Sequence, residues 1–103
     1  MELDKFKAVL ESSGLPVTYN AWPEREAPPL PYVCWLESGS SNFSADGVVY
    51  HPVKRLRAEL YEAYRDASAE QALESALDSF FYQKTPNYID TEKCYQIIYE
   101  LEV

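Results

Sequence analysis

Three closely spaced prolines, Pro28, Pro29 and Pro31, constrain this chain more than any other feature. They lack a backbone N–H donor and hold φ fixed, so this stretch can form neither a helix nor the interior of a sheet. The segment that follows, residues 32–36, is apolar, with β-branched and aromatic side chains, which is typical of a strand buried on both faces. The sequence therefore predicts a strand that begins directly after the prolines and lies at the centre of a sheet.

The length and the net charge limit the number of domains and the function classes that this chain can have. A chain of 103 residues is one domain and buries roughly 65% of the surface that its unfolded form exposes. Its composition, 47% hydrophobic and 15% aromatic, argues against disorder. The net charge of −8 weighs against direct nucleic-acid binding, which depends on Lys and Arg contacts to phosphate. The same acidity suits a channel through which DNA slides without sticking.

The start of the chain and its cysteines indicate a reducing compartment. No apolar run approaches the ~20 residues of a membrane span, and the first residues lack the basic and apolar parts of a signal peptide. We therefore expect the protein to stay in the cytoplasm that makes it. Cys34 and Cys94 match no metal-binding spacing, and we expect both to be reduced thiols packed as small hydrophobes.

The first half of the chain predicts a short helix, a strand and a hairpin. Apolar residues recur at helical spacing over residues 2–12, with Gly14 placed to end the helix, and residues 17–22 alternate like a strand. The pair Asp46-Gly47 is a strong turn signal and follows a loop-like stretch. We expect an extended hairpin arm here, mobile in the free subunit and ordered only against neighbours.

Residues 53–65 fit two structures. Leu56, Leu60 and Tyr64 match one face of a helix, and the local composition favours a helix. Leu56, Ala58 and Leu60 also alternate with charged residues, as in a half-buried strand. We predict a strand, because a buried central strand needs neighbours on both sides.

The last third predicts a helix and then a strand. Apolar residues at helical spacing predict a helix over residues 69–82, which Ser68 and Gln71 would begin as a capping box. Tyr88-Ile89 reads as a short extended link after Pro86, and residues 94–103 alternate like a strand. The predicted fold class is α+β, in the order α-β-β-β-α-β, with one mainly antiparallel sheet flanked by two helices in a single domain, residues 1–103.

Two groups of charged residues lie on predicted elements. An acidic stripe recurs every four residues near one face of the second helix: Asp66, Glu70, Glu74 and Asp78. The first interpretation is a solvated outer face. The second is contact across an interface with the basic cluster of another copy, which consists of Lys54, Arg55 and Arg57.

Nothing in the sequence points to catalysis. His51 is the only histidine, and any His-based metal cluster or nucleophile arrangement would depend on it alone. The carboxylates fall on faces predicted to be exposed, where nothing would raise a pKa for general acid chemistry. The three glycines are too far apart for a phosphate-binding loop. We expect no enzyme activity, cofactor or metal.

The aromatic residues divide into two groups. Tyr95 and Tyr99 share a face with Ile97 and Leu101, so we expect them in the core. The others lie near turns or on mixed faces, where an interface role is nearly as plausible as burial. These residues are Trp22, Phe43, Tyr50, Tyr61 and Tyr64.

Three stretches together resemble a family of small proteins from tailed phages and prophages. Residues 23–35 read Pro-x-x-x-Ala-Pro-Pro-Leu-Pro-Tyr-x-Cys-Trp, residues 42–46 read Asn-Phe-Ser-Ala-Asp, and residues 59–61 read Glu-Leu-Tyr. The similarity runs from about Leu15 to Val103. Members of this family usually belong to the head-to-tail morphogenesis set and are generally taken as tail completion, or tail terminator, proteins.

The resemblance implies a structural role. Similar lambda-type tail terminators close into hexameric rings at the head-proximal end of the tail tube, where they stop polymerisation and present the surface that docks the head. The implied partners are further copies of the chain, the major tail tube protein and the connector or head-closure proteins. DNA would pass through the ring without specific binding. The implied location is the tail or neck of the virion, assembled in the bacterial cytoplasm without contact with a membrane.

Position and charge, rather than the family, suggest the contact residues. They are Asn42, Phe43, Asp46, Tyr50, His51, Lys54, Arg55, Arg57, Glu70, Glu74 and Asp78. Two other functions fit the same sequence: a head-closure or head–tail joining subunit, and a small acidic protein-binding module. An enzyme is a third class, with His51 as its last support.

Overall fold

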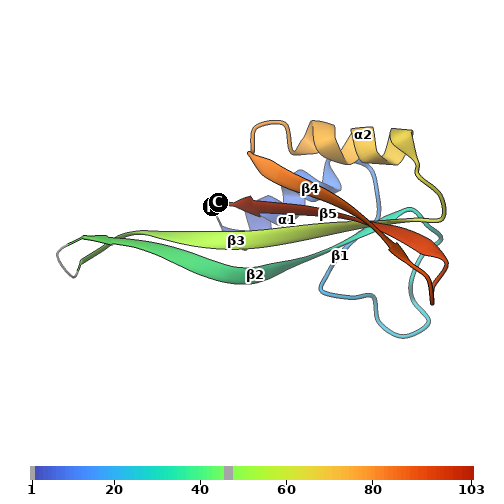
Figure 1. Cartoon of the computed structure of the whole chain (residues 1–103), viewed down its shortest axis with the longest axis horizontal. Helices are drawn as coiled ribbons and strands as arrows, with labels where there is room; N and C mark the ends of the chain where they lie inside the picture. Colours follow the sequence, from blue (N-terminus) through green and yellow to red (C-terminus); the bar gives the residue numbers. More distant parts are fainter. Residues whose placement is uncertain (1, 46–47) are drawn as a thin grey trace.

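The computed structural model describes residues 2–45 and 48–103, with side chains outside residues 41–52. These residues form two helices and five strands, and the predicted α+β class is confirmed. Figure 1 labels the elements. In chain order they are α1 (Leu3–Glu11), β1 (Val17–Tyr19), β2 (Tyr32–Ala45), β3 (Val48–Glu62), α2 (Ala67–Ala76), β4 (Tyr82–Ile89) and β5 (Cys94–Glu102).

The five strands form one mixed sheet in the order β1-β2-β3-β5-β4. Three of the neighbouring pairs are antiparallel, whereas β1 runs parallel to β2. The prediction that the strand after the prolines is central was wrong, because β3 holds the centre and β2 lies next to it. The prediction of burial on both faces was right, since the consecutive residues Val33, Cys34 and Trp35 are all buried.

Both helices cover the same face of the sheet. The side chains of Phe6 and Leu10 from α1, and of Leu73 and Leu77 from α2, belong to one buried cluster. Their partners on the sheet are alternate residues of β2, β3 and β5: Val33, Trp35, Leu56, Ala58, Leu60, Ile97, Tyr99 and Leu101. The alternation predicted for β3 is confirmed, and so is the burial of Tyr99. No helix covers the opposite side of the sheet within the described residues, and we call that side the open face (Figure 1).

The ends of the helices follow local chemistry that was only partly predictable. Gly14 has φ of +83° and ends the turn after α1, as expected. Helix α2 begins earlier than predicted, because the carboxylate of Asp66 accepts a hydrogen bond from the Ala69 amide at 3.1 Å and replaces the predicted Ser68 cap. The helix also ends at Ala76 rather than near residue 82.

Strand β4 was not predicted. Its residues carry no apolar alternation, and only Tyr88-Ile89 was expected to be extended. The whole of β4 nevertheless pairs with β5, from Tyr82↔Leu101 to Ile89↔Cys94. An edge strand tolerates proline because the backbone groups on its outer side have no neighbouring strand to bond with, so the missing N–H costs no hydrogen bond. The expected link at Tyr88-Ile89 is the end of this strand.

The predicted hairpin arm is confirmed as a paired ribbon. Strands β2 and β3 stay paired out to Ala45↔Val48, with register shifts between Glu37 and Gly39 and between Phe43 and Ser44. The pairing of β3 with β5 ends near Lys54, whose amide and carbonyl bond to Val103. We define the arm as residues 40–45 and 48–53. It projects beyond the body and stretches the molecule to 49 × 26 × 23 Å (Figure 1). The expected mobility of the arm remains a prediction.

The core cluster predicts which substitutions unfold the protein. Leu73→Ala removes a fully buried side chain between α2 and the sheet, and should lower the free energy of unfolding by about 2–5 kcal/mol. Phe81→Ala, at a side chain that is 99% exposed, is the control and should change it by less than about 0.5 kcal/mol. Urea denaturation measures both; equal losses would contradict the assigned core.

Candidate assembly surfaces

The open face of the sheet carries a ladder of charged and polar residues. Alternate residues of β3 stand opposite alternate residues of β5, in the pairs Arg55↔Glu102, Arg57↔Glu100, Glu59↔Ile98 and Tyr61↔Gln96. The Arg55 and Glu102 side chains are 4.0 Å apart, and both are more than half exposed. Arg57 Nε lies 3.6 Å from Glu59 Oε2. Charges of both signs therefore alternate along this face.

A hydrogen-bonded network orders the middle of the open face. Gln96 Nε2 donates to Glu59 Oε2 and to the Tyr61 hydroxyl, both at 3.1 Å, and the Tyr61 hydroxyl donates to Glu59 Oε1 at 3.2 Å. Asn87 of β4 extends the network to Gln96. Burial, with the neighbouring Glu59 carboxylate, raises the pKa of Tyr61. Glu59 is buried despite its place on the uncovered face, so the expectation that all carboxylates are exposed was wrong here.

A cleft of about 710 Å³ opens beside this network, beneath the proline-containing loop. Trp22 and Tyr32 meet edge to face with ring centroids 5.7 Å apart, and Tyr32 lies 5.5 Å from the Tyr61 ring. The loop supplies Pro28 and Leu30. Two of the stretches that carry the family resemblance, residues 23–35 and 59–61, thus meet at one corner of the sheet.

Both cysteines line the same cleft as buried, free thiols, as predicted. Burial and the Glu59 carboxylate raise the pKa of Cys34 to about 11, and burial also raises the pKa of Cys94. Nucleophilic cysteines need the opposite shift, because the thiolate is the reactive form. These thiols therefore serve packing.

Two buried carboxyl groups face each other between β3 and α2. Glu70 is held by Arg65 through two hydrogen bonds of 2.9 Å, and by Lys84 at 2.8 Å. These partners lower the pKa of Glu70 to about 2, Arg65 contributing most. Glu62 is 1% exposed, and burial beside Glu70 raises its pKa to about 8. Burial beside Glu70 thus favours the protonated form of Glu62 at pH 7, and we infer that Glu62 donates a hydrogen bond through Oε1–H to the Glu70 carboxylate.

The acidic stripe of α2 is mostly engaged inside the molecule. Glu74 Oε2 accepts hydrogen bonds from the Tyr99 hydroxyl at 2.7 Å and from Lys84 Nζ at 2.6 Å. Asp66 caps the helix, and Glu70 is buried in the pair just described. Only Asp78 is exposed. The interpretation of the whole stripe as a solvated outer face was wrong, because Lys84 lies on a strand that was not predicted.

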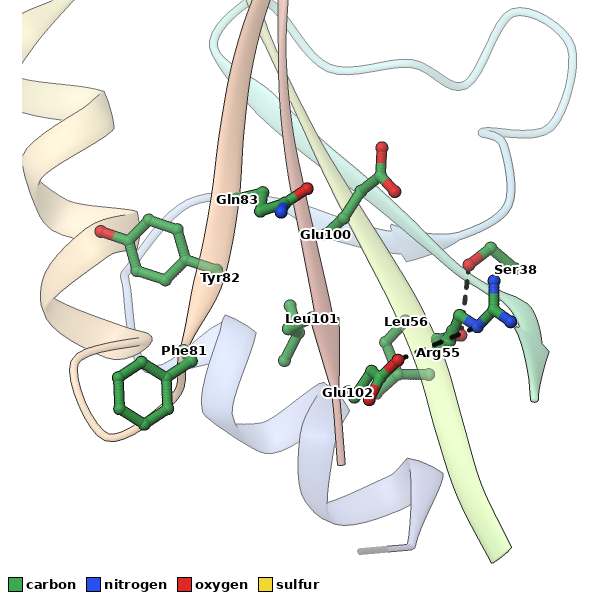
Figure 2. A pocket seen from close by; sticks show the side chains of 9 residues that line it. All are labelled: Ser38, Arg55, Leu56, Phe81, Tyr82, Gln83, Glu100, Leu101 and Glu102. Atoms are coloured by element: carbon green, nitrogen blue, oxygen red, sulfur yellow. Dashed lines mark hydrogen bonds and ion pairs between the residues drawn. The ribbon is translucent and has the colours of Figure 1, made fainter. Parts of the chain in front are cut away.

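A second depression, of about 570 Å³, lies at the other end of the sheet near the base of the arm (Figure 2). The Ser38 hydroxyl donates to the Arg55 carbonyl at 3.3 Å, next to the Arg55–Glu102 pair. Phe81 stands at the turn before β4 with its ring directed away from the sheet. Its exposure of 99% is the highest among the large hydrophobic side chains that the structure describes.

The predicted contact residues lie in three separate places. Lys54, Arg55 and Arg57 lie on β3 at the base of the arm, whereas Glu70 and Glu74 lie on α2, against the sheet. The backbones of Asn42, Phe43, Tyr50 and His51 belong to the arm strands, but their side chains, and all of Asp46, lie outside the described residues.

The sequence predicted neither the exposure of Phe81 nor the meeting of the residues that line the cleft. The helical spacing of residues 69–81 placed Phe81 in a core, and nothing in the sequence showed that the helix ends at Ala76. Trp22 and Tyr61 were recognised as possible contact residues, and they do lie together at the cleft. The proline run is the sequence signal that could have placed Trp22 near Tyr61, because this segment leads the chain from β1 back to β2.

The described residues contain neither a metal-binding cluster nor a membrane-spanning helix. No group of three or more His, Cys, Asp or Glu side chains in residues 2–45 and 48–103 is placed to hold a metal ion. None of the helices in that part of the chain is long and apolar enough to cross a membrane.

Comparison with solved structures finds this fold in a virion. A chain of the structure titled "Virion of native gene transfer agent (GTA) particle" superimposes with a TM-score of 0.63 and 14% sequence identity. The match covers 97% of this chain and 85% of the other. No family model and no curated protein matches the sequence. At this identity, the likeness shows that the two chains share a fold.

The Glu62–Glu70 pair predicts an unusual pH dependence of stability. The pKa of Glu62 is higher in the folded protein than in the unfolded chain, so stability falls as pH rises from about 5 to about 8, by up to about 1.4 kcal/mol per pH unit. Glu62→Gln keeps a donor toward Glu70 without a titrating proton, and should remove this slope. Urea denaturation across that pH range tests it, with the exposed Glu11→Gln as control. A slope unchanged in Glu62→Gln would show that no proton is held there.

Proposed function

We propose that this chain is a structural protein of a phage-like virion and acts as a tail terminator. In this role copies close into a ring, most simply a hexamer, at the head-proximal end of the tail tube. The ring ends tube polymerisation and joins the tail to the head. The chain is not an enzyme and needs no cofactor; its partners are its own copies, the major tail tube protein and the connector or head-closure proteins.

The observation that carries the proposal is the match in fold to a chain of a gene transfer agent virion, which extends over 97% of this chain. The sequence stretches that resemble tail completion proteins support the same role independently, because that resemblance came from residues rather than from the fold. The match in fold does not specify a position in the particle, whereas the sequence resemblance points to the head-proximal end of the tail. The role as a virion structural protein is the general part of the proposal, and the tail terminator role is its specific part.

The surfaces suit assembly. A ring needs two different patches on each subunit, so that every contact repeats around a closed circle. The arm extends residues 40–45 and 48–53 beyond the body, and pairing between its two strands provides its backbone order. An arm of this kind reaches a neighbouring subunit without disturbing the core, because the core residues lie on the other half of β2 and β3.

The charges suit passage of DNA. The open face alternates Arg55 and Arg57 with Glu59, Glu100 and Glu102, so it offers no continuous basic surface to phosphates. With a net charge of −8, the subunit as a whole repels DNA. A ring built from it would let DNA through without holding it.

Removal of the gene tests the terminator role. In cells that assemble the particle without this protein, we expect tails much longer than normal, because nothing stops the polymerising tube. A plasmid copy of the gene should restore the normal length. Electron microscopy of negatively stained particles measures both. Tails of normal length that lack heads would instead assign the protein to head–tail joining, and normal tails with heads attached would refute both roles.

Shortening the arm tests its part in assembly. Replacing residues 42–52 with Asn-Gly closes the hairpin at the Ser41↔Val53 pair with a two-residue turn. We expect the thermal unfolding midpoint to change little, since the core is untouched, whereas the shortened protein should fail to restore tail length. Normal tails made with the shortened protein would show that the arm is dispensable.

A further inference from the structure

Phe81 is placed as a contact residue rather than a core residue. Its ring is 99% exposed and points away from the sheet at the turn between α2 and β4 (Figure 2). Single exposed hydrophobic residues are common and need no special explanation. Phe81 differs because an unfilled apolar cleft exists elsewhere on the same molecule.

That cleft lies at the opposite end of the same strand. Strand β4 begins next to Phe81 and ends at Ile89, which lines the cleft. At about 3.3 Å per residue, the two features are some 23 Å apart along the strand. The cleft, of about 710 Å³, is large enough for a phenyl ring, and its aromatic wall is formed by Trp22 and Tyr32. Trp22 Nε1 is buried and has no hydrogen-bond partner among the described residues.

We propose that Phe81 of one copy inserts into this cleft on a second copy of the chain, and that this contact repeats around the ring. The inference rests on the proposed function, because it assigns the contact through which the ring closes. A ring contact joins two different patches of the same chain, and here the patches lie at opposite ends of β4.

The structure favours this contact over one between charges. In the charged alternative, the acidic stripe of α2 meets the basic cluster of β3 in another copy. Glu70 and Glu74 already bond to Lys84, and Glu70 also bonds to Arg65, within the same chain. Because Glu70 is buried, breaking its pairs with Arg65 and Lys84 for an intermolecular partner is costly. Burial of Phe81 in the cleft sacrifices no existing interaction.

Crosslinking locates the contact. A photoreactive benzophenone amino acid at position 81 should, on illumination of the assembled protein, crosslink to residues 21–32 of another copy. Mass spectrometry of mixed labelled and unlabelled protein identifies the site and shows that it is intermolecular. Crosslinks from position 81 to any other region of the assembled protein would overturn the inference while leaving a ring, and hence the proposed function, intact.

Substitution of Phe81 measures how much this contact contributes to self-association. Phe81→Ser should raise the midpoint concentration of self-association about tenfold or more, while Tyr64→Ser, which removes another exposed aromatic outside the cleft, should not. The wild-type midpoint should change little between about 50 mM and about 500 mM salt, because the contact is apolar. An unchanged midpoint in Phe81→Ser refutes the contact, and a strictly monomeric wild-type protein also refutes the ring.

Discussion

The pairing of β3 with neighbours on both sides is the constraint on which the rest of the structure depends. The second half of β3 lies between β2 and β5, and its side chains Leu56, Ala58 and Leu60 belong to the core. Its first half stays paired with β2 beyond the sheet, with register shifts after Glu37 and after Phe43, and becomes one strand of the arm. The core fixes the register of β3 up to the first of these shifts, because a one-residue slip would turn the buried side chains to the opposite face.

The sequence predicted the elements that have a strong pattern of their own. Alternation identified β5, and composition together with the proline run located the start of β2. Strand β3 was ambiguous, since its leucines also fit a helix, and its neighbours decided the outcome. Strand β4 could not be predicted, because polar residues and Pro86 interrupt its β-forming residues and leave it without an apolar face.

The candidate surfaces were less predictable because they depend on what meets in space. Charge spacing along α2 suggested an exposed stripe, but Lys84 arrives from an unpredicted strand and neutralises Glu70 and Glu74. The cleft joins residues far apart in sequence, Trp22 and Tyr61, whose proximity follows from the return of the chain after β1. Local patterns therefore described the core well and the surfaces poorly.

Ring closure is the central claim, and the mass of the assembled protein tests it most directly. Native mass spectrometry over a wide range of concentration should show monomer giving way to a single closed species, with six copies as the simplest expectation. That species should not grow further as concentration rises, because each contact in a closed ring is satisfied. A series of ever larger species, or monomer alone at all concentrations, would contradict the account.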